Sequence, residues 1–265
     1  MSDIKVALIQ SSLYWEDPKA NKDMFEKMIY DINEPVDIVV LPEVFTTGYT
    51  MDPTNCAESY KGETFQWMKQ LAGEKNFVIV GTMPTLDNGK FYNRLIWMQP
   101  DGNFHKYDKR HLFTFAGETK NYTPGKERVI VEYKGWRFML NICYDLRFPV
   151  WSKNNYSPDK GFDFDCIINV ANWPAVRSKP WSILLIARAI ENQAYMIGVN
   201  RLGKDGKGVD HSGDSAVICP KGENLSSLKP YEEKTEIITM GRKQLDDFRE
   251  KFRVAEDWDK FKLLG

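Results

Sequence analysis

Long apolar runs and an excess of charge of one sign are absent from this sequence, and we expect no secretion signal. No apolar stretch approaches the roughly 20 residues that span a bilayer, and the amino-terminal segment turns polar at Ser11 and Ser12, too early for a secretory signal. The 36 basic and 37 acidic side chains leave a formal net charge of −1, which gives no attraction to nucleic acid or to an anionic membrane. We expect a cytoplasmic protein that binds a small molecule, with no nucleic-acid or membrane partner.

Cysteines at metal-binding spacing are also missing. The four cysteines show neither a CxxC nor a CxxH pattern, so the sequence predicts no disulfide framework and no structural zinc site. They are Cys56, Cys143, Cys166 and Cys219. We expect free thiols, and the question becomes whether one of them is reactive.

Hydrophobic periodicity predicts a single α/β domain over residues 1–265. Strands are predicted at residues 5–9, 37–41, 77–82, 91–98, 103–107, 129–133, 136–142, 164–170, 195–200 and 215–218, and helices at 18–32, 63–74, 181–194 and 242–252. Asp17 is a favourable N-cap for the first helix, and Pro18 suits its first turn. The turn Pro-Asp-Gly at 100–102 joins two strands into a hairpin, which makes the sheet mixed. No linker or repeat divides the chain.

Three chemically capable side chains lie at the ends of predicted strands: Glu43, Lys109 and Cys143. Ligands of α/β proteins bind at such ends, because the loops there carry function while the sheet holds them rigidly. Taken singly, each residue has an ordinary interpretation. Cys143 could be a packed thiol, Glu43 a solvated strand end and Lys109 part of a charged stretch.

Together, these residues form a plausible nucleophilic site. A thiol needs a base to become a thiolate, and the Glu43 carboxylate is a candidate. An attacked amide carbonyl becomes an oxyanion, which the Lys109 ammonium and the backbone N–H of Tyr144 would stabilise. The sequence therefore predicts a cysteine-dependent amide hydrolase, with a Cys-His hydrolase based on His111 or His211 as the alternative.

The motifs around these residues resemble the nitrilase, or carbon-nitrogen hydrolase, superfamily. The resemblance rests on LPE at 41–43, YDKRHLF at 107–113 and NICYDLRFP at 141–149, in matching order and spacing. It continues through AGETKNYTPG at 116–125, ANWPAVRS at 171–178, ARAIENQAYMIGVNRLGKDGKG at 187–208 and HSGDSAVICPKGE at 211–223, and so covers nearly the whole chain.

This resemblance implies a fold, a site and an assembly. It implies a four-layer αββα sandwich with mixed sheets that forms a homodimer or a higher homo-oligomer. It implies a catalytic triad of Glu43, Lys109 and Cys143, supported by Glu118, with the Tyr144 amide in the oxyanion hole. The reaction would proceed through a cysteine thioester and would need no metal or organic cofactor.

Within the superfamily, CYDLRFP combined with NWPAVRS resembles the bacterial omega-amidases. These enzymes hydrolyse the terminal amide of 2-oxoglutaramate and 2-oxosuccinamate. CYDLRFP is also shared with amidases that act on deaminated glutathione, which stay an alternative. A catalytically silent dimeric binding protein of the same fold is another.

A 2-oxo acid amide carries a carboxylate, and a guanidinium suits a carboxylate bidentately. Arg177 is the first candidate for this contact and Arg147 its rival, unless Arg147 pairs with Asp145 or Glu191. Trp173 and Phe115 are candidates for the pocket wall. Arg188 and Glu191, three residues apart on one helix, are interpreted as a structural ion pair.

Overall fold

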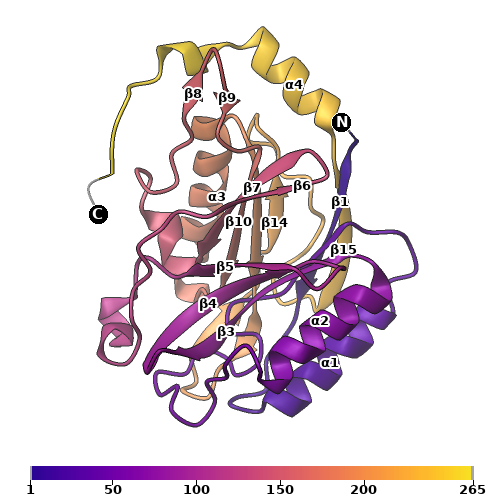
Figure 1. The fold of residues 1–265 in the computed structure, drawn as a ribbon, viewed down its shortest axis with the longest axis vertical. Helices are drawn as coiled ribbons and strands as arrows, with labels where there is room; N and C mark the ends of the chain where they lie inside the picture. Colours follow the sequence, from indigo (N-terminus) through magenta and orange to yellow (C-terminus); the bar gives the residue numbers. More distant parts are fainter. Residues whose placement is uncertain (1, 264–265) are drawn as a thin grey trace.

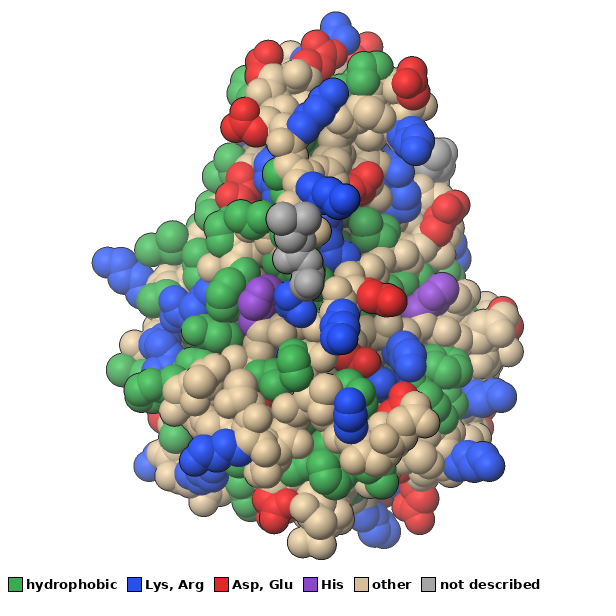
Figure 2. Space-filling view, turned by 60° about the vertical axis from the view of Figure 1, so that its left-hand side comes forward, with side chains coloured by type: hydrophobic (Ala, Val, Ile, Leu, Met, Phe, Trp, Pro, Cys, Tyr) green, Lys and Arg blue, Asp and Glu red, His purple; other side chains and the backbone are tan. Residues whose placement is uncertain are grey.

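The computed structural model describes residues 2–263 and contains two β-sheets packed face to face, each covered by helices on its outer side (Figure 1). This is the expected four-layer αββα sandwich. Met1 and residues 264–265, which the predicted domain includes, lie outside the described residues. On the face drawn in Figure 2, Lys and Arg side chains are interspersed with Asp and Glu side chains, as the balanced composition predicts.

The first sheet has six strands in the order β15-β1-β2-β3-β4-β5. Their bounds are β1 (Ile4–Gln10), β2 (Ile38–Val40), β3 (Val78–Asp87), β4 (Lys90–Met98), β5 (Phe104–Asp108) and β15 (Lys234–Met240). β1, β2 and β3 run parallel, whereas β4, β5 and β15 pair antiparallel with their neighbours, so the mixed sheet and its hairpin are confirmed. The sequence pattern did not predict β15.

The second sheet has five strands in the order β14-β11-β10-β7-β6, with β7, β10 and β11 parallel. Their bounds are β6 (Ile130–Tyr133), β7 (Trp136–Ile142), β10 (Cys166–Ala171), β11 (Tyr195–Asn200) and β14 (Ala216–Ile218). Two short hairpins lie outside both sheets: β8 (Tyr156–Ser157) with β9 (Gly161–Phe162), and β12 (Leu202–Lys204) with β13 (Asp210–Ser212). Neither hairpin was predicted.

The helices form the outer layers. α1 (Pro18–Tyr30) and α2 (Glu63–Lys75) lie side by side on the six-stranded sheet, and α3 (Ser178–Asn192) covers the other sheet (Figure 1). α4 (Arg242–Lys251) follows β15 near the end of the chain. The Asp17 side chain accepts a hydrogen bond from the Ala20 N–H at 3.0 Å, which confirms the predicted N-cap.

Alternation along β1 explains why the sheets stack. Val6 and Leu8 belong to the core between the sheets, whereas Ala7 and Ile9 pack with Phe25 of α1 in a separate cluster under the helices. Side chains of adjacent strand residues point to opposite faces, so one strand contributes to both cores. Burying a large apolar side chain contributes about 1.5–3 kcal/mol to the stability of the fold. Because both sheets are packed in this way, they form rigid supports for the loops at their strand ends.

Candidate active site

Two strand ends, one from each sheet, carry unusual backbone conformations. β7 ends at Ile142, and Cys143 begins a short 3-10 helix (Cys143–Arg147) with φ at 44°. Val44, which follows Glu43 beyond β2, has φ at 40°. Positive φ is uncommon outside glycine, costs energy and often marks functional sites. The sharp turn at Cys143 places its partly buried thiol at a pocket rather than in the strand ladder.

Lys109 lies between two carboxylates. Its Nζ is 2.8 Å from Glu43 Oε1 and 3.0 Å from Glu118 Oε2, and none of the three side chains is exposed to solvent. Burial alone lowers the pKa of Lys109, but the charges of Glu118 and Glu43 outweigh burial and hold that pKa well above its ordinary value. Lys109 therefore stays a cation.

Asn93 of β4, which the sequence reasoning missed, holds the same carboxylates. Its Nδ2 donates to Glu43 Oε1 at 2.8 Å and to Glu118 Oε1 at 3.3 Å. The Phe113 N–H donates to Glu118 Oε2 at 2.6 Å. A signal for Asn93 was available, because a buried amide within an apolar strand needs partners.

Asn172, which directly follows β10, binds Glu43 from the second sheet. Its backbone N–H donates to Glu43 Oε2 at 2.8 Å, and its Nδ2 donates to the Glu43 carbonyl oxygen. Glu43 is thereby fixed by groups from both sheets, which explains how a carboxylate is held in a buried position.

The Cys143 thiol is neutral in this setting. Burial is the largest cause that raises its pKa, and the Glu43 charge raises the pKa further, while the Lys109 charge lowers it. The charge of Glu118 also raises it. The Tyr144 N–H belongs to the first turn of the 3-10 helix, where backbone amides have no partner within the helix and stay available to a ligand.

Asp145 joins the loop after β5 to the turn at Cys143. Its Oδ2 accepts from the Ile142 N–H at 2.9 Å and from the Tyr107 hydroxyl at 2.7 Å. Its Oδ1 accepts from the His111 N–H at 3.0 Å and lies 2.8 Å from His111 Nδ1. The loop that carries Lys109 is thus tied to the turn that carries Cys143.

The suggested pairing of Arg147 with Asp145 or Glu191 is wrong, because both carboxylates have other partners. Asp145 is occupied as above, and Glu191 pairs with Arg188 at 2.8 Å, which confirms the Arg188–Glu191 ion pair. The Arg147 guanidinium instead lies 4.7 Å from the centroid of the Trp173 ring.

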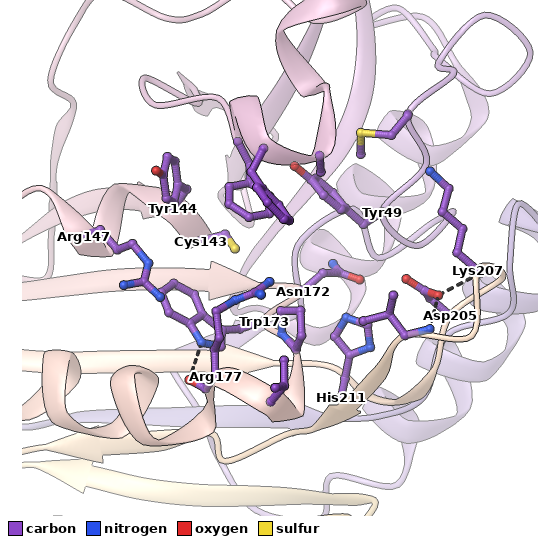
Figure 3. Close-up of a pocket in the computed structure, with 17 residues that line it drawn as sticks. Tyr49, Cys143, Tyr144, Arg147, Asn172, Trp173, Arg177, Asp205, Lys207 and His211 are labelled. Carbon is purple, nitrogen blue, oxygen red and sulfur yellow. Dashed lines mark hydrogen bonds between the residues drawn. The ribbon is translucent and has the colours of Figure 1, made fainter.

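A cavity of about 340 Å³ opens over Cys143 (Figure 3). All four residues predicted to bind the substrate line it: Phe115, Arg147, Trp173 and Arg177. Trp173 is 3% exposed and forms the wall, whereas Phe115 is 88% exposed and lies at the rim. Tyr49, a further candidate for the pocket wall, and His211 also line the cavity. The remaining lining residues were not predicted: Met51, Phe113, Ala116, Asn172, Pro174, Val176, Asp205, Lys207 and Val209.

The β12–β13 hairpin explains several of these omissions. Its turn brings Asp205 and Lys207 to the pocket, and Asp205 Oδ1 accepts from the N–H groups of Lys207 and Val209 at 2.8 and 2.9 Å. The run Lys-Asp-Gly-Lys-Gly at 204–208 is a turn signal that could have predicted the hairpin. Its position over the pocket follows only from the packing of the sheets.

Two guanidinium groups face the pocket without anionic partners. Arg147 lies against Trp173, and Arg177 lies 5.6 Å from the centroid of the Phe113 ring. Among residues 2–263, neither side chain forms an ion pair or a side-chain hydrogen bond. The pocket therefore suits an anionic ligand.

The two histidines of the alternative Cys-His site are engaged elsewhere. His111 pairs with Asp145 and stacks on Phe148, with ring centroids 3.7 Å apart. His211 Nδ1 lies 3.2 Å from the Gly203 carbonyl oxygen, and burial, helped by the Arg201 charge, lowers the His211 pKa to about 4. In the described part of the chain, neither ring hydrogen-bonds Cys143.

No cluster of three or more His, Cys, Asp or Glu side chains within residues 2–263 is suited to a metal ion. None of the helices that the structure describes is long and apolar enough to cross a membrane.

Comparisons with known proteins identify the family of this chain. The carbon-nitrogen hydrolase family model matches residues 5–250. The chain is 41% identical to the omega-amidase YafV of Yersinia enterocolitica over the full length of both proteins. It is 30% identical to a 2-oxoglutaramate amidase of Bacillus subtilis, across 83% of this chain and 85% of that protein.

A solved structure is similar throughout. A protein of the same superfamily from Xanthomonas campestris, which carries an arsenic adduct in its active site, superimposes with a TM-score of 0.96 at 38% identity. The match covers 99% of this chain and 100% of that one. The chain belongs to the carbon-nitrogen hydrolase family, and it is a hydrolase that acts on amides.

Proposed function

We propose that this protein hydrolyses the terminal amide of small 2-oxo acid amides, 2-oxoglutaramate and 2-oxosuccinamate, to the dicarboxylate and ammonia. One observation carries the proposal: a single pocket is lined by Cys143, which lies near the buried Glu43–Lys109 ion pair, and by two guanidinium groups that lack anionic partners. Cys143, Glu43 and Lys109 suit an amide, and the two guanidinium groups suit a carboxylate. Relatives named omega-amidase and 2-oxoglutaramate amidase support the same assignment.

In the proposed acylation step, Glu43 removes the Cys143 proton while the sulfur attacks the amide carbon. Because burial and the Glu43 charge raise the pKa of the Cys143 thiol and so favour its neutral form, the proposal has the proton leave during the attack. The carbonyl oxygen gains a negative charge, which the Lys109 ammonium and the Tyr144 N–H stabilise. Glu43 then gives the proton to nitrogen, the carbon-nitrogen bond breaks, and ammonia leaves a thioester on Cys143.

Deacylation uses the same groups. Glu43 takes a proton from water, the hydroxide adds to the thioester carbon, and Lys109 and the Tyr144 N–H again stabilise the oxyanion. The carbon-sulfur bond breaks, and the proton held by Glu43 returns to the sulfur. Glu118 supports both steps by holding Lys109 3.0 Å from its own carboxylate.

The other end of the substrate lies against the arginines in this proposal. Arg177 binds the carboxylate, and Arg147 and Trp173 form the neighbouring wall with Phe115 at the rim. A charge-assisted bidentate hydrogen bond fixes both the position and the orientation of a ligand. Correct placement of the amide over Cys143 then follows from the length of the substrate.

Mass spectrometry of Cys143 tests the chemistry. After rapid mixing with 2-oxoglutaramate and acid quenching, the peptide that contains Cys143 should gain the mass of the substrate minus ammonia. Cys143→Ala should form no adduct and release no ammonia, whereas Cys56→Ala, a matched change at another partly buried thiol, should retain both. A folded Cys143→Ala variant that still releases ammonia would show that another group is the nucleophile.

Kinetics on two substrates separate the remaining alternatives. We expect kcat/KM for 2-oxoglutaramate to exceed that for deaminated glutathione, since the cavity of about 340 Å³ is at the small end for ligand pockets. The reverse order would identify an amidase of deaminated glutathione. Absence of adduct and turnover with both compounds would indicate a silent binding protein.

A further inference from the structure

Asn172 presents an unpaired acceptor in the wall of the pocket. It lines the cavity together with Cys143, and its side chain is nearly buried, with 4% of the residue exposed. Its Oδ1 is shielded from solvent and has no hydrogen-bond partner among the described residues. Buried polar atoms are rarely left unpaired in a native protein, and such an exception calls for an explanation.

The orientation of the Asn172 amide is fixed. Its Nδ2 donates to the carbonyl oxygen of Glu43, which can only accept, so the nitrogen has to occupy that side. The backbone N–H of the same residue donates to Glu43 Oε2 at 2.8 Å. Oδ1 is therefore the free end, and rotating the amide would break the hydrogen bond with Glu43.

We infer that Asn172 Oδ1 accepts a hydrogen bond from the NH2 group of the substrate and thereby selects primary amides over N-substituted ones. The inference rests on the proposed function, in which Glu43 delivers a proton to the leaving nitrogen. That nitrogen has to come within hydrogen-bonding distance of Glu43. Asn172 is attached to Glu43 by two hydrogen bonds and lines the pocket together with Cys143 (Figure 3), and the inference therefore places its acceptor beside the same nitrogen.

The chemistry of the amide completes the argument. A primary amide nitrogen carries two N–H donors, and Glu43 and Asn172 Oδ1 provide one acceptor each. An N-substituted amide replaces one donor with carbon, which leaves Oδ1 unpaired and pushes the substituent against Asn172. Sites built to pair a polar group discriminate strongly against analogues that lack it.

The test compares 2-oxoglutaramate with its N-methyl amide in the wild type and in Asn172→Ala. The wild type should prefer the primary amide by at least about 100-fold in kcat/KM. Asn172→Ala should lose activity on the primary amide, and the preference should fall at least about tenfold, because the acceptor is gone and space for a methyl group is created. Where N-methyl turnover is below detection, its inhibition constant against 2-oxoglutaramate gives the same comparison.

Asn93→Ala is the matched control. Asn93 also donates to Glu43 at 2.8 Å, but it does not line the pocket, so its loss disturbs Glu43 without removing a substrate contact. Both amides should then lose activity by the same factor, with the preference retained. A preference unchanged in Asn172→Ala would overturn the inference, as would an equal fall in both variants. A wild type inactive on 2-oxoglutaramate would instead contradict the proposed function.

Discussion

Lys109 and Glu43 form an ion pair, 2.8 Å from Nζ to Oε1, in which neither side chain is exposed to solvent. Removing two charges from water is costly, and their attraction offsets the cost only when further hydrogen bonds satisfy them. Here Glu118 and Asn93 provide these further contacts, Glu118 to Lys109 and Asn93 to Glu43. The cluster is therefore a group of interdependent charges, and the loss of one member leaves the others uncompensated.

The first prediction concerns Lys109→Met. This change leaves Glu43 and Glu118 buried side by side without a counter-charge, so we expect a loss of about 3–5 kcal/mol in the free energy of unfolding, measured by urea denaturation. Amide hydrolysis should fall below detection. Glu118→Gln, which keeps the Lys109–Glu43 pair, should cost clearly less stability. Equal losses in the two variants would contradict the view that Lys109 neutralises both carboxylates.

The sequence predicted those parts of the fold that depend on local periodicity. The strand β7 and the N-cap Asp17 are examples, since apolar alternation and capping are properties of neighbouring residues. Helix ends were less accurate: α3 begins at Ser178 rather than 181. The edge strand β15 was missed because its residues are mostly polar or half-exposed, and it pairs with β1 from the other end of the chain.

The candidate site was predicted unevenly for a similar reason. The structure brings Glu43, Lys109, Glu118 and Cys143 together, as the motifs suggested. Asn172 was missed because its importance comes from a contact between the two sheets, and Asn93 because its partners Glu43 and Glu118 are distant in the sequence. The catalytic roles of Glu43, Lys109, Glu118 and Cys143 stay predictions, as do the homodimer and the cytoplasmic location.

The second prediction concerns the pH dependence of Cys143 reactivity. Burial and the Glu43 charge raise its pKa well above the ordinary 9.0, so the thiolate is scarce at neutral pH. In Cys56→Ala, the rate of iodoacetamide alkylation at Cys143 should rise about tenfold per pH unit through pH 9, because only the thiolate reacts. Peptide mass mapping gives this rate. A plateau beginning below pH 7 would indicate a preformed thiolate ion pair instead.

The third prediction concerns Tyr49, whose ring lies over Lys109 with the centroid 5.0 Å from Nζ. Its hydroxyl is buried at the pocket and has no partner among the described residues. Because an unpaired buried hydroxyl is destabilising, Tyr49→Phe should raise the free energy of unfolding by about 1 kcal/mol. Activity on 2-oxoglutaramate should fall, since the hydroxyl is then unavailable to the ligand. A variant that is less stable than the wild type would show that the hydroxyl has a partner in solution.

The fourth prediction separates the two arginines of the pocket. If Arg177 binds the substrate carboxylate, Arg177→Met should lower kcat/KM for 2-oxoglutaramate by about 10- to 100-fold, mainly through KM, because a charge-assisted hydrogen bond is lost. A neutral amide of the same length, pentanamide, should be affected little. Arg147→Met removes a guanidinium that lies on Trp173. Because this change disturbs the packing of the pocket wall, it should lower kcat/KM for both substrates to a similar degree.

Arg177→Lys sharpens this test, because it keeps the charge but loses the planar fork that matches a carboxylate. Activity on 2-oxoglutaramate should recover only in part, since an ammonium binds as a point charge without bidentate geometry. Full recovery would mean that the charge alone attracts the substrate. If Arg147→Met lowered kcat/KM only for 2-oxoglutaramate and Arg177→Met left it unchanged, Arg147 would be the residue that binds the carboxylate. The kinetics of these three variants on two amides therefore assign the anchor that the sequence left open.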